Sequence, residues 1–488
     1  MALLEAGKTC WRIEPAERVS FLVDAQDYFA ALAPVLDQAR RSILMLGWDF
    51  DPRTRLRPDG FEAPDEPDEI GQILLRLAAE RPDLDIRVLI WRSALPVSAS
   101  QEFFPHRARR WFKNSRVRFR LDDAVPFGAC HHQKVVVIDD AVAFCGGVDF
   151  ATDRWDTTAH LDADSRRIDP NQGHHAPRHE AMMMVDGAAA QGLADLARER
   201  WRRATGDSLA KPDYAPGADR AAWPVTVRPD LTQTPVAIVR TEPAWAGRPE
   251  VHEWRDLTFR AIAAAREVIY LENQYFTSPV ITEALCRRLA EPDGPQVVLI
   301  STHRSPSYFD RITMDRIRTL MIRRLQAADV HGRFRAYCPM TVSGRPVIVH
   351  SKVMIVDDTL LRIGSSNLNN RSCGFDTECE LTIEAQDEAA AKAIRRLRHR
   401  LAGHFIGRGA DDVEAAVTRL GGLVPAMETL RHGRRLEPVK LLKLGPLAAV
   451  IAEFHLGDPL DTDDTWRVLR RRRKIRALVK AVSEGRAP

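Results

Sequence analysis

The sequence predicts an α/β protein made of two repeats related by a pseudo-twofold axis, each a mixed or parallel β-sheet flanked by helices. A mainly helical C-terminal extension follows them. Two observations predict this fold class. The same series of short apolar runs occurs twice, and each series ends in the same pattern of charged residues. Helical patterns lie between these runs, and strands that alternate with helices are typical of α/β folds.

The two series match in order and in approximate spacing. The first contains ILMLGWDFDP from Ile43, LDIRVLIWRS from Leu84 and HHQKVVVIDDAVAFCGGVDF from His131. The second contains VIYLENQYFTSP from Val268, PQVVLISTHRS from Pro295 and VHSKVMIVDDTLLRIGSSNLN from Val349. Runs this rich in valine, isoleucine and leucine predict buried strands. Apolar periodicity predicts helices over Asp24–Ala39, Glu69–Ala79, Val251–Ala265 and Met314–Ala328.

Changes in composition suggest the domain boundaries. We expect a first catalytic repeat over 1–207, a proline-rich linker over 208–235, a second catalytic repeat over 236–408 and a helical, basic extension over 409–488. The last helix of the extension is expected to begin near Asp464 or Thr465 as N-cap.

Bulk composition excludes little. The chain has 71 basic and 67 acidic residues, and a net charge of +4 identifies no class of partner. The seven cysteines are odd in number and form no CxxC pair, so we expect reduced, buried thiols. We see no signal peptide and no apolar stretch that could span a membrane, and therefore expect a protein that is cytoplasmic or peripheral to the inner membrane face.

A spacing of H-x-K-x4-D occurs in both repeats. It comprises His132, Lys134 and Asp139 in the first repeat and His350, Lys352 and Asp357 in the second. Glycine follows each histidine by fourteen residues, at Gly146 and Gly364. One such spacing arises by chance in any long chain, but two on the same strand pattern are strong evidence for a duplicated site. We take these six residues as the candidate catalytic set, and expect the two aspartates to brace their loops.

Strand geometry explains the motif. Alternate residues of a strand share a face, so each histidine points the same way as its lysine. If the halves pack about a pseudo-twofold axis, a phosphodiester lies between two imidazoles and two ammonium groups. One imidazole can attack phosphorus while the other protonates the leaving oxygen. The lysines stabilise charge on the non-bridging oxygens, so we expect the reaction to need no metal and no cofactor.

Further residues complete the candidate site. Each imidazole needs an acceptor on its second nitrogen. Glu378, downstream of His350 in the second half, and Glu180, its counterpart in the first half, are the candidate orienting acids. The candidate phosphate-binding residues follow the two motif glycines and differ between the halves: Gly147 and Asp149 in the first, Ser365 and Asn367 in the second. An acid facing a phosphate would repel it, so Asp149 either points away or binds a head group.

These residues resemble the phospholipase D superfamily, whose hallmark is the duplicated H-x-K-x4-D. The segments GGVDFATDRWDT (Gly146–Thr157), YLENQYF (Tyr270–Phe276) and PRHE (Pro177–Glu180) are similar to segments of eukaryotic-type phospholipases D. The resemblance implies hydrolysis of glycerophospholipids to phosphatidate and a free alcohol through a phosphohistidine, with transphosphatidylation when an alcohol accepts. It also implies that His132 is the nucleophile and His350 the general acid.

Alternatives stay open within this superfamily. One is a cardiolipin or phosphatidylserine synthase-like transferase, and another is a nuclease, although we expect no nucleic-acid partner. The expected partner is a phospholipid at a membrane surface, and the fused repeat favours a monomer. The basic helix over 466–482 either packs on the core by its apolar face, which we favour, or contacts anionic lipid.

Overall fold

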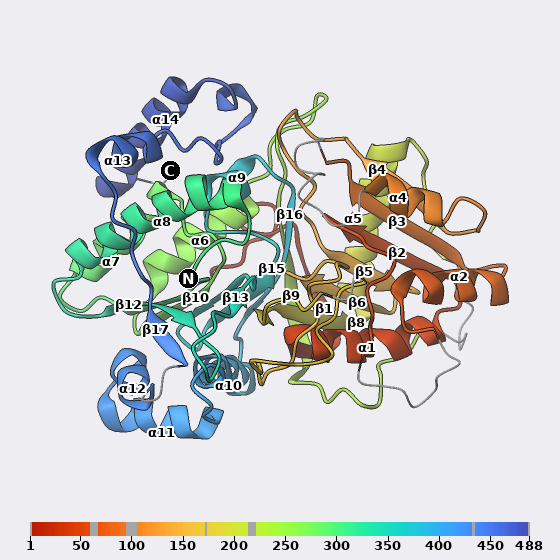
Figure 1. Cartoon of the computed structure of the whole chain (residues 1–488), viewed down its shortest axis with the longest axis horizontal. Helices are drawn as coiled ribbons and strands as arrows, with labels where there is room; N and C mark the ends of the chain where they lie inside the picture. Colours follow the sequence, from red (N-terminus) through yellow and green to blue (C-terminus); the bar gives the residue numbers. More distant parts are fainter. Residues whose placement is uncertain are drawn as a thin grey trace.

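The computed structural model describes residues 2–58, 67–93, 105–170, 173–212, 221–431 and 435–486. Within these residues, fifteen strands form one mixed sheet in the order β17-β12-β11-β10-β14-β15-β16-β9-β1-β8-β6-β5-β2-β3-β4. The strand order from the centre of the sheet to its edge is equivalent in the two halves. In the first half this order is β8-β6-β5-β2-β3-β4, and in the second half it is β16-β15-β14-β10-β11-β12. The predicted α/β class with two repeats is confirmed (Figure 1).

The strands of the first half are β1 (Arg12–Val23), β2 (Ser42–Gly47), β3 (Asp85–Trp91), β4 (Arg118–Asp122), β5 (Val135–Ile138), β6 (Val142–Gly146), β7 (Arg178–His179) and β8 (Ala181–Asp186). Those that follow are β9 (Leu231–Thr241), β10 (Val268–Glu272), β11 (Gln296–Ile300), β12 (Phe334–Pro339), β13 (Ile348–Val349), β14 (Val353–Val356), β15 (Leu360–Gly364), β16 (Glu378–Glu384) and β17 (Leu436–Pro438).

The helices of the two halves are α1 (Asp24–Gln38), α2 (Ile70–Glu80), α4 (Pro105–Trp111), α5 (Gly187–Thr205), α6 (Glu253–Ala264), α7 (Pro279–Ala290), α8 (Tyr308–Ala328), α9 (Asn370–Gly374) and α10 (Glu388–His404). The extension contains α11 (Ala410–Leu420), α12 (Leu423–Leu430), α13 (Pro446–Ala452), the 3-10 helix η1 (Thr462–Asp464) and α14 (Val468–Ser483). Each predicted helix is present, and α8 begins before the predicted Met314.

The two halves join at the centre of the sheet. Strand β1 pairs antiparallel with β8 on one side and with β9 on the other, and β9 pairs in turn with β16. One apolar core covers this join. It holds Val19 of β1, Ile238 of β9 and Leu381 of β16, together with Leu193 of α5 and Leu397 of α10. The halves are therefore one continuous sheet, which fixes the position of one motif relative to the other.

The expected linker over 208–235 is too long at its end, because Leu231 begins β9. Pro235 interrupts the strand pattern of this segment in the sequence, because proline is uncommon within strands. Pro235 lies opposite Pro15 of β1 in the register of the two strands. Neither residue has an amide hydrogen to donate, so the pair tolerates a position where a single proline would leave a partner unbonded.

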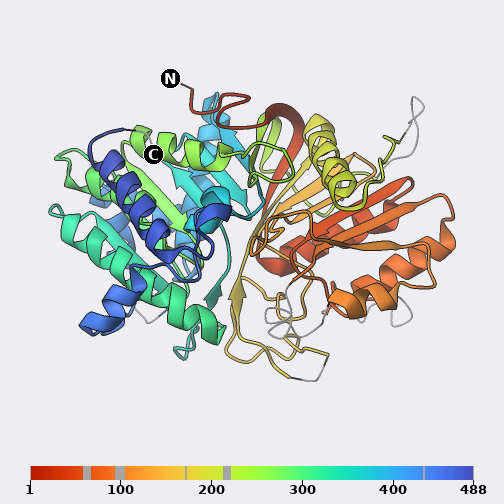
Figure 2. The same cartoon turned by 90° about the horizontal axis from the view of Figure 1, so that it is seen from above.

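The extension packs on the second half (Figures 1 and 2). Helix α14 contacts α7, and its Ile475 and Val482 are buried. The helix begins at Val468, so the prediction of Asp464 or Thr465 as N-cap is wrong. Asp464 instead accepts a hydrogen bond from the buried guanidinium of Arg471. None of the described helices is both long enough and apolar enough to cross a bilayer.

Candidate active site

The backbone of each motif is anchored to the opposite half. The amide of His132 donates to the carbonyl of Thr377 over 3.0 Å, and the amide of His350 donates to the carbonyl of His179 over 2.9 Å. Each carbonyl belongs to the residue immediately before a candidate orienting acid. The two-stranded pairing of β13 with β7 supports the second of these contacts. Each histidine is thus fixed by main-chain contacts next to the acid of the other repeat.

The side chains complete two crossed pairs. Nδ1 of His132 lies 2.9 Å from Oε2 of Glu378, and Nδ1 of His350 lies 3.0 Å from Oε2 of Glu180. The sequence suggested that each acid serves the histidine of its own half, and that pairing is wrong. With Nδ1 held by a carboxylate, Nε2 is the nitrogen of each ring left for chemistry. Each catalytic unit is therefore assembled from both repeats.

Glu378 is held by two hydroxyl groups. Ser365 donates to its Oε2 over 2.5 Å, and Ser372 donates to its Oε1 over 2.6 Å. The Ser365 hydroxyl, expected to bind phosphate, is engaged by this acid. These bonds stabilise the charged form of Glu378, while burial raises its pKa above the ordinary value.

Gly147 occupies the position in the first repeat that Ser365 occupies in the second. A Cβ atom at Gly147 would lie 3.1 Å from Oε2 of Glu180 and 3.3 Å from the carbonyl oxygen of His350. Contacts this close require that the acid or the second motif move. Glycine is therefore needed here so that Glu180 can reach across the halves to His350.

The two lysines are almost fully buried, with 2% of each residue exposed. Nζ of Lys134 donates to the carbonyl of His132 over 3.0 Å, and Nζ of Lys352 donates to the carbonyl of His350 over 2.5 Å. Lys134 also forms an ion pair of 3.1 Å with Asp149. The ammonium group of Lys134 is thus partly neutralised, whereas that of Lys352 forms no ion pair with a carboxylate of the described residues.

Asp149 points toward the loop after β2. Its Oδ1 accepts hydrogen bonds from the amides of Trp48 (2.8 Å) and Asp49 (3.3 Å). The repulsion expected between this acid and a phosphate is reduced, because the carboxylate is paired with Lys134. In the second half, Oδ1 of the equivalent Asn367 is buried without a hydrogen bond to any described residue.

Charges from both halves act on each imidazole. Burial, followed by the positive charges of Lys134 and Lys352, lowers the pKa of His132 well below its ordinary value. Burial and then the charge of Lys352 lower the pKa of His350 in the same direction, with Lys134 contributing. Burial also lowers the pKa of Lys352 to about 7, assisted by Lys134. The two motifs therefore share one electrostatic environment, which favours a bound anion.

Two buried arginines belong to the site although the motif spacing did not indicate them. The positive charges of Arg154 and Arg178 lower the pKa of His350 further, after burial and Lys352. Arg178 is fixed by Asp153, through a hydrogen bond to its carbonyl of 2.9 Å and an ion pair with its carboxylate. Both arginines lie inside segments that are similar to those of eukaryotic-type phospholipases D, GGVDFATDRWDT and PRHE, and this similarity is the signal that could have indicated them.

Asp139 and Asp357 belong to loops at the far ends of their strands. Each motif lysine directly precedes its strand and each aspartate directly follows it, so the strand separates the two. The carboxylates accept hydrogen bonds from consecutive backbone amides: those of Arg40, Arg41 and Ser42 for Asp139, and those of Arg266, Glu267 and Val268 for Asp357. The two aspartates thus brace the starts of β2 and β10, each a strand's length away from its motif lysine.

Two family models match the chain. One described as phospholipase D covers residues 35–220, and one described as cardiolipin synthase, PLD-like domain, covers residues 258–401. Phospholipase D A of Dictyostelium discoideum is 24% identical over 431 residues, which make up 76% of this chain and 33% of that protein. Phospholipase D1 of Saccharomyces cerevisiae is 24% identical over 507 residues, 81% of this chain and 29% of that protein. The chain thus spans about a third of the length of these relatives.

A solved structure shares the fold. Phosphatidylserine synthase from Haemophilus influenzae superposes with a TM-score of 0.54 at 11% identity, over 86% of this chain and 97% of that one. At such low identity the match bears on the fold alone.

Proposed function

This chain belongs to the phospholipase D superfamily, and from that premise we propose that it is a phosphodiesterase that hydrolyses glycerophospholipids to phosphatidate and the free head-group alcohol. The crossed His132–Glu378 and His350–Glu180 pairs carry the proposal. They present two oriented imidazoles beside two buried ammonium groups, an arrangement suited to displacement at a phosphodiester.

The reaction has two steps. Nε2 of His132 attacks phosphorus, the bond from phosphorus to the head-group oxygen breaks, and His350 gives its Nε2 proton to that oxygen. Water then donates a proton to His350 and attacks the phosphohistidine, which releases phosphatidate and free His132. The lowered pKa of His132 keeps the nucleophile neutral. The negative charge of the bound phosphodiester offsets the two lysines and lets His350 carry the proton that it donates.

Transfer to an alcohol is the second candidate function. The match of residues 258–401 to the family model described as cardiolipin synthase, PLD-like domain, favours it. The chemistry is the same up to the phosphohistidine, after which an alcohol replaces water. The outcome then depends on which acceptor reaches His350 in the second step.

Exposed aromatic side chains support a membrane-facing role for the region next to the first motif. Phe127 and Trp466 are 72% and 76% exposed, and their rings lie 5.8 Å apart. Phe127 precedes His132 by a short loop, and Trp466 precedes the basic helix α14. Leu469, 65% exposed, extends the same segment. Aromatic residues beside basic ones bind the interface of anionic bilayers, so we propose that this edge contacts the phospholipid surface.

The test uses mixed phospholipid vesicles without added divalent cations, with and without ethanol. We expect phosphatidate from the wild type, phosphatidylethanol when ethanol is present, and a loss of about 10³-fold or more in His132→Ala. His174→Ala, which alters an exposed loop residue, is the matched control.

The products separate the candidate functions. Cardiolipin or phosphatidylserine as the main product, with the cognate acceptor supplied, would assign the chain to transfer. Unchanged turnover in His132→Ala would show that His132 is not the nucleophile. The absence of any lipid product would contradict the proposed function.

A further inference from the structure

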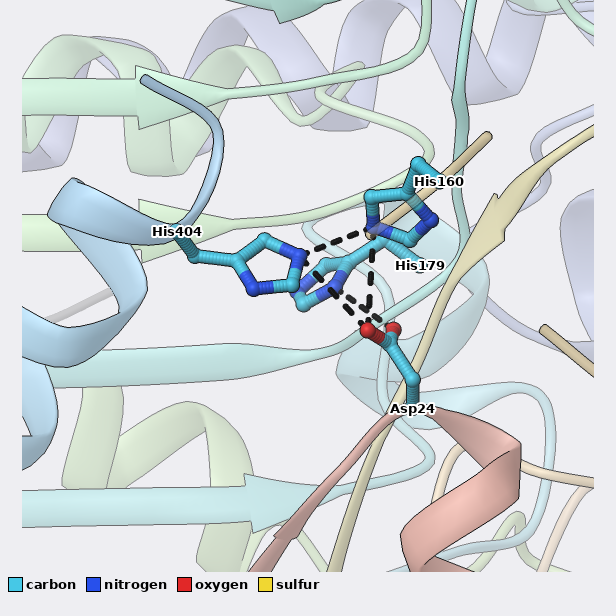
Figure 3. A group of neighbouring side chains, drawn as sticks. All are labelled: Asp24, His160, His179 and His404. Atoms are coloured by element: carbon cyan, nitrogen blue, oxygen red, sulfur yellow. Dashed lines mark hydrogen bonds and ion pairs between the residues drawn. The ribbon is translucent and has the colours of Figure 1, made fainter. Parts of the chain in front are cut away.

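Three histidines and an aspartate meet in the interior outside the candidate active site (Figure 3). They are Asp24, His160, His179 and His404, each with a ligand atom within 4.8 Å of the others. Asp24 begins α1, His160 lies in the segment between β6 and β7, His179 ends β7 and His404 ends α10. The first three belong to the first half and the last to the second. Their side chains are at most 6% exposed.

Three of these atoms have the separations of metal ligands. Oδ2 of Asp24 lies 3.6 Å from Nε2 of His160 and 3.5 Å from Nε2 of His404, and the two nitrogens are 2.8 Å apart. The point equidistant from all three atoms therefore lies roughly 2 Å from each, which matches the distances that Zn²⁺ takes to imidazole nitrogen and carboxylate oxygen.

Acidic partners hold the cluster in this orientation. Nδ1 of His160 lies 2.8 Å from Oδ2 of Asp156, which leaves Nε2 facing the equidistant point. His179 lies between two carboxylates, with Nδ1 2.9 Å from Oδ1 of Asp24 and Nε2 2.9 Å from Oε2 of Glu272. Metal-binding histidines ordinarily engage a carboxylate or carbonyl on their other nitrogen in this way.

Hydrogen bonding within the protein does not account for the whole cluster. A proton between the facing Nε2 atoms of His160 and His404 satisfies both rings. That proton does not reach Oδ2 of Asp24, which has no hydrogen-bond partner among the described residues. Asp24 is only 1% exposed, so bulk water does not satisfy this oxygen. An unpartnered buried carboxylate oxygen is costly, and a cation satisfies it and both imidazoles together.

We propose that Asp24, His160 and His404 bind a divalent transition-metal ion of the Zn²⁺ type, with His179 positioning the aspartate. The ion ties α10 of the second half to the first half. It also supports the active site, since the amide of Asp24 donates to the carbonyl of Glu180 over 2.9 Å, and the amide of Glu180 donates to Oδ1 of Asp24 over 3.0 Å. The expectation that the reaction needs no metal rests on the two motif lysines and concerns the catalytic step. The ion proposed here is structural, and its ligands lie far apart in the sequence.

The test measures metal in the full chain, purified with an affinity tag that contains no histidine. Elemental mass spectrometry of the purified protein should find about one equivalent of Zn²⁺ or another first-row transition metal per chain. Asp24→Asn and His404→Ala should each lower this by at least tenfold, while His174→Ala, the exposed-loop control, should keep it. Circular dichroism establishes that each variant is folded.

Cobalt provides the second measurement, which needs no variant. Wild-type protein stripped by a chelator in mild denaturant and refolded should bind one Co²⁺ with the visible absorption of an ion held by nitrogen and oxygen ligands, and Zn²⁺ should displace it. Binding of less than a tenth of an equivalent of either ion would overturn the proposal, as would folded ligand variants that bind like the wild type. Neither readout depends on lipid turnover.

Discussion

At the scale of single residues, the chemistry depends on contacts between residues far apart in the chain. Glu378 is 246 positions from the histidine that it orients, and Glu180 is 170 positions from its partner. Each acid is fully buried and so is most of each imidazole. The orientation of both rings is therefore only as accurate as the packing of one repeat against the other.

The lowered pKa of Lys352 predicts how substrate binding depends on pH. Its ammonium group, with a pKa of about 7, loses its proton above neutrality and then no longer attracts a phosphodiester. We expect KM for a soluble short-chain phosphatidylcholine to rise roughly tenfold between about pH 7 and pH 8.5, since the charged fraction falls about tenfold per pH unit above the pKa.

Lys352→Arg is the matched control, because guanidinium stays charged throughout this range. Its KM should stay level between pH 7 and 8.5 even if kcat is lower. Equal pH dependence in the two proteins would show that another group titrates.

The sequence predicts which residues form the site, but it does not predict which of them contact one another. His132, Lys134, His350 and Lys352 follow from a duplicated spacing, which needs only the sequence. Which acid meets which histidine depends on how the repeats pack, and two similar repeats carry no local mark of that choice. The buried metal-type cluster was missed for a similar reason, because its four residues come from distant places in the chain, three from the ends of elements and His160 from a loop.

At the scale of elements, α14 shows one face to the protein and another to solvent. Ile475 and Val482 are buried against the second half, as favoured for this helix, while Leu469 and the preceding Trp466 are exposed. Packing and lipid contact are thus compatible in one helix. The buried Arg471 holds the first turn of the helix to η1 through Asp464, two residues before Trp466.

Removing the exposed aromatic pair should affect binding to a lipid surface. We expect Phe127→Ala and Trp466→Ala each to raise the apparent KM on anionic vesicles about tenfold, because each ring loses about 1.5–3 kcal/mol of apolar burial in the bilayer. Turnover of the soluble short-chain lipid should stay within twofold of wild type.

Val330→Ala removes another exposed apolar side chain and serves as control. Equal loss on vesicles and on soluble substrate would place the aromatic pair in the folding of the site and not in membrane contact.

At the scale of the whole molecule, the centre of the sheet determines the geometry of the site. Strands β1 and β9 join the repeats, and both crossed pairs span this join. The pseudo-twofold arrangement of repeats could be predicted from the sequence. The strands at the join could not, since Pro15 and Pro235 obscure the periodicity of both.

A cavity at the join should impair catalysis more than an equal cavity elsewhere. Ile238 of β9 and Ile86 of β3 are both fully buried, and replacing either with alanine costs about 2–5 kcal/mol of stability. At a temperature where both variants are folded, we expect Ile238→Ala to lower kcat about tenfold or more, because small misplacements of reacting groups are costly. Ile86→Ala, in the outer part of the sheet, should keep kcat within twofold. Similar values of kcat in the two variants would show that the site is insensitive to the join.

The order of pairing at the join also sets a demand during biosynthesis. As the chain leaves the ribosome, β1 can pair with β8 early, but its other edge stays unpaired until β9 emerges. One edge of β9 then stays unpaired until β16 emerges. The middle of the sheet thus stays open until the second repeat is nearly complete, while unpaired edges remain available to neighbouring nascent chains. A ribosome that stalls before β16 releases a product that is inactive and exposes a long adhesive edge, so translation through the second repeat protects the first from aggregation.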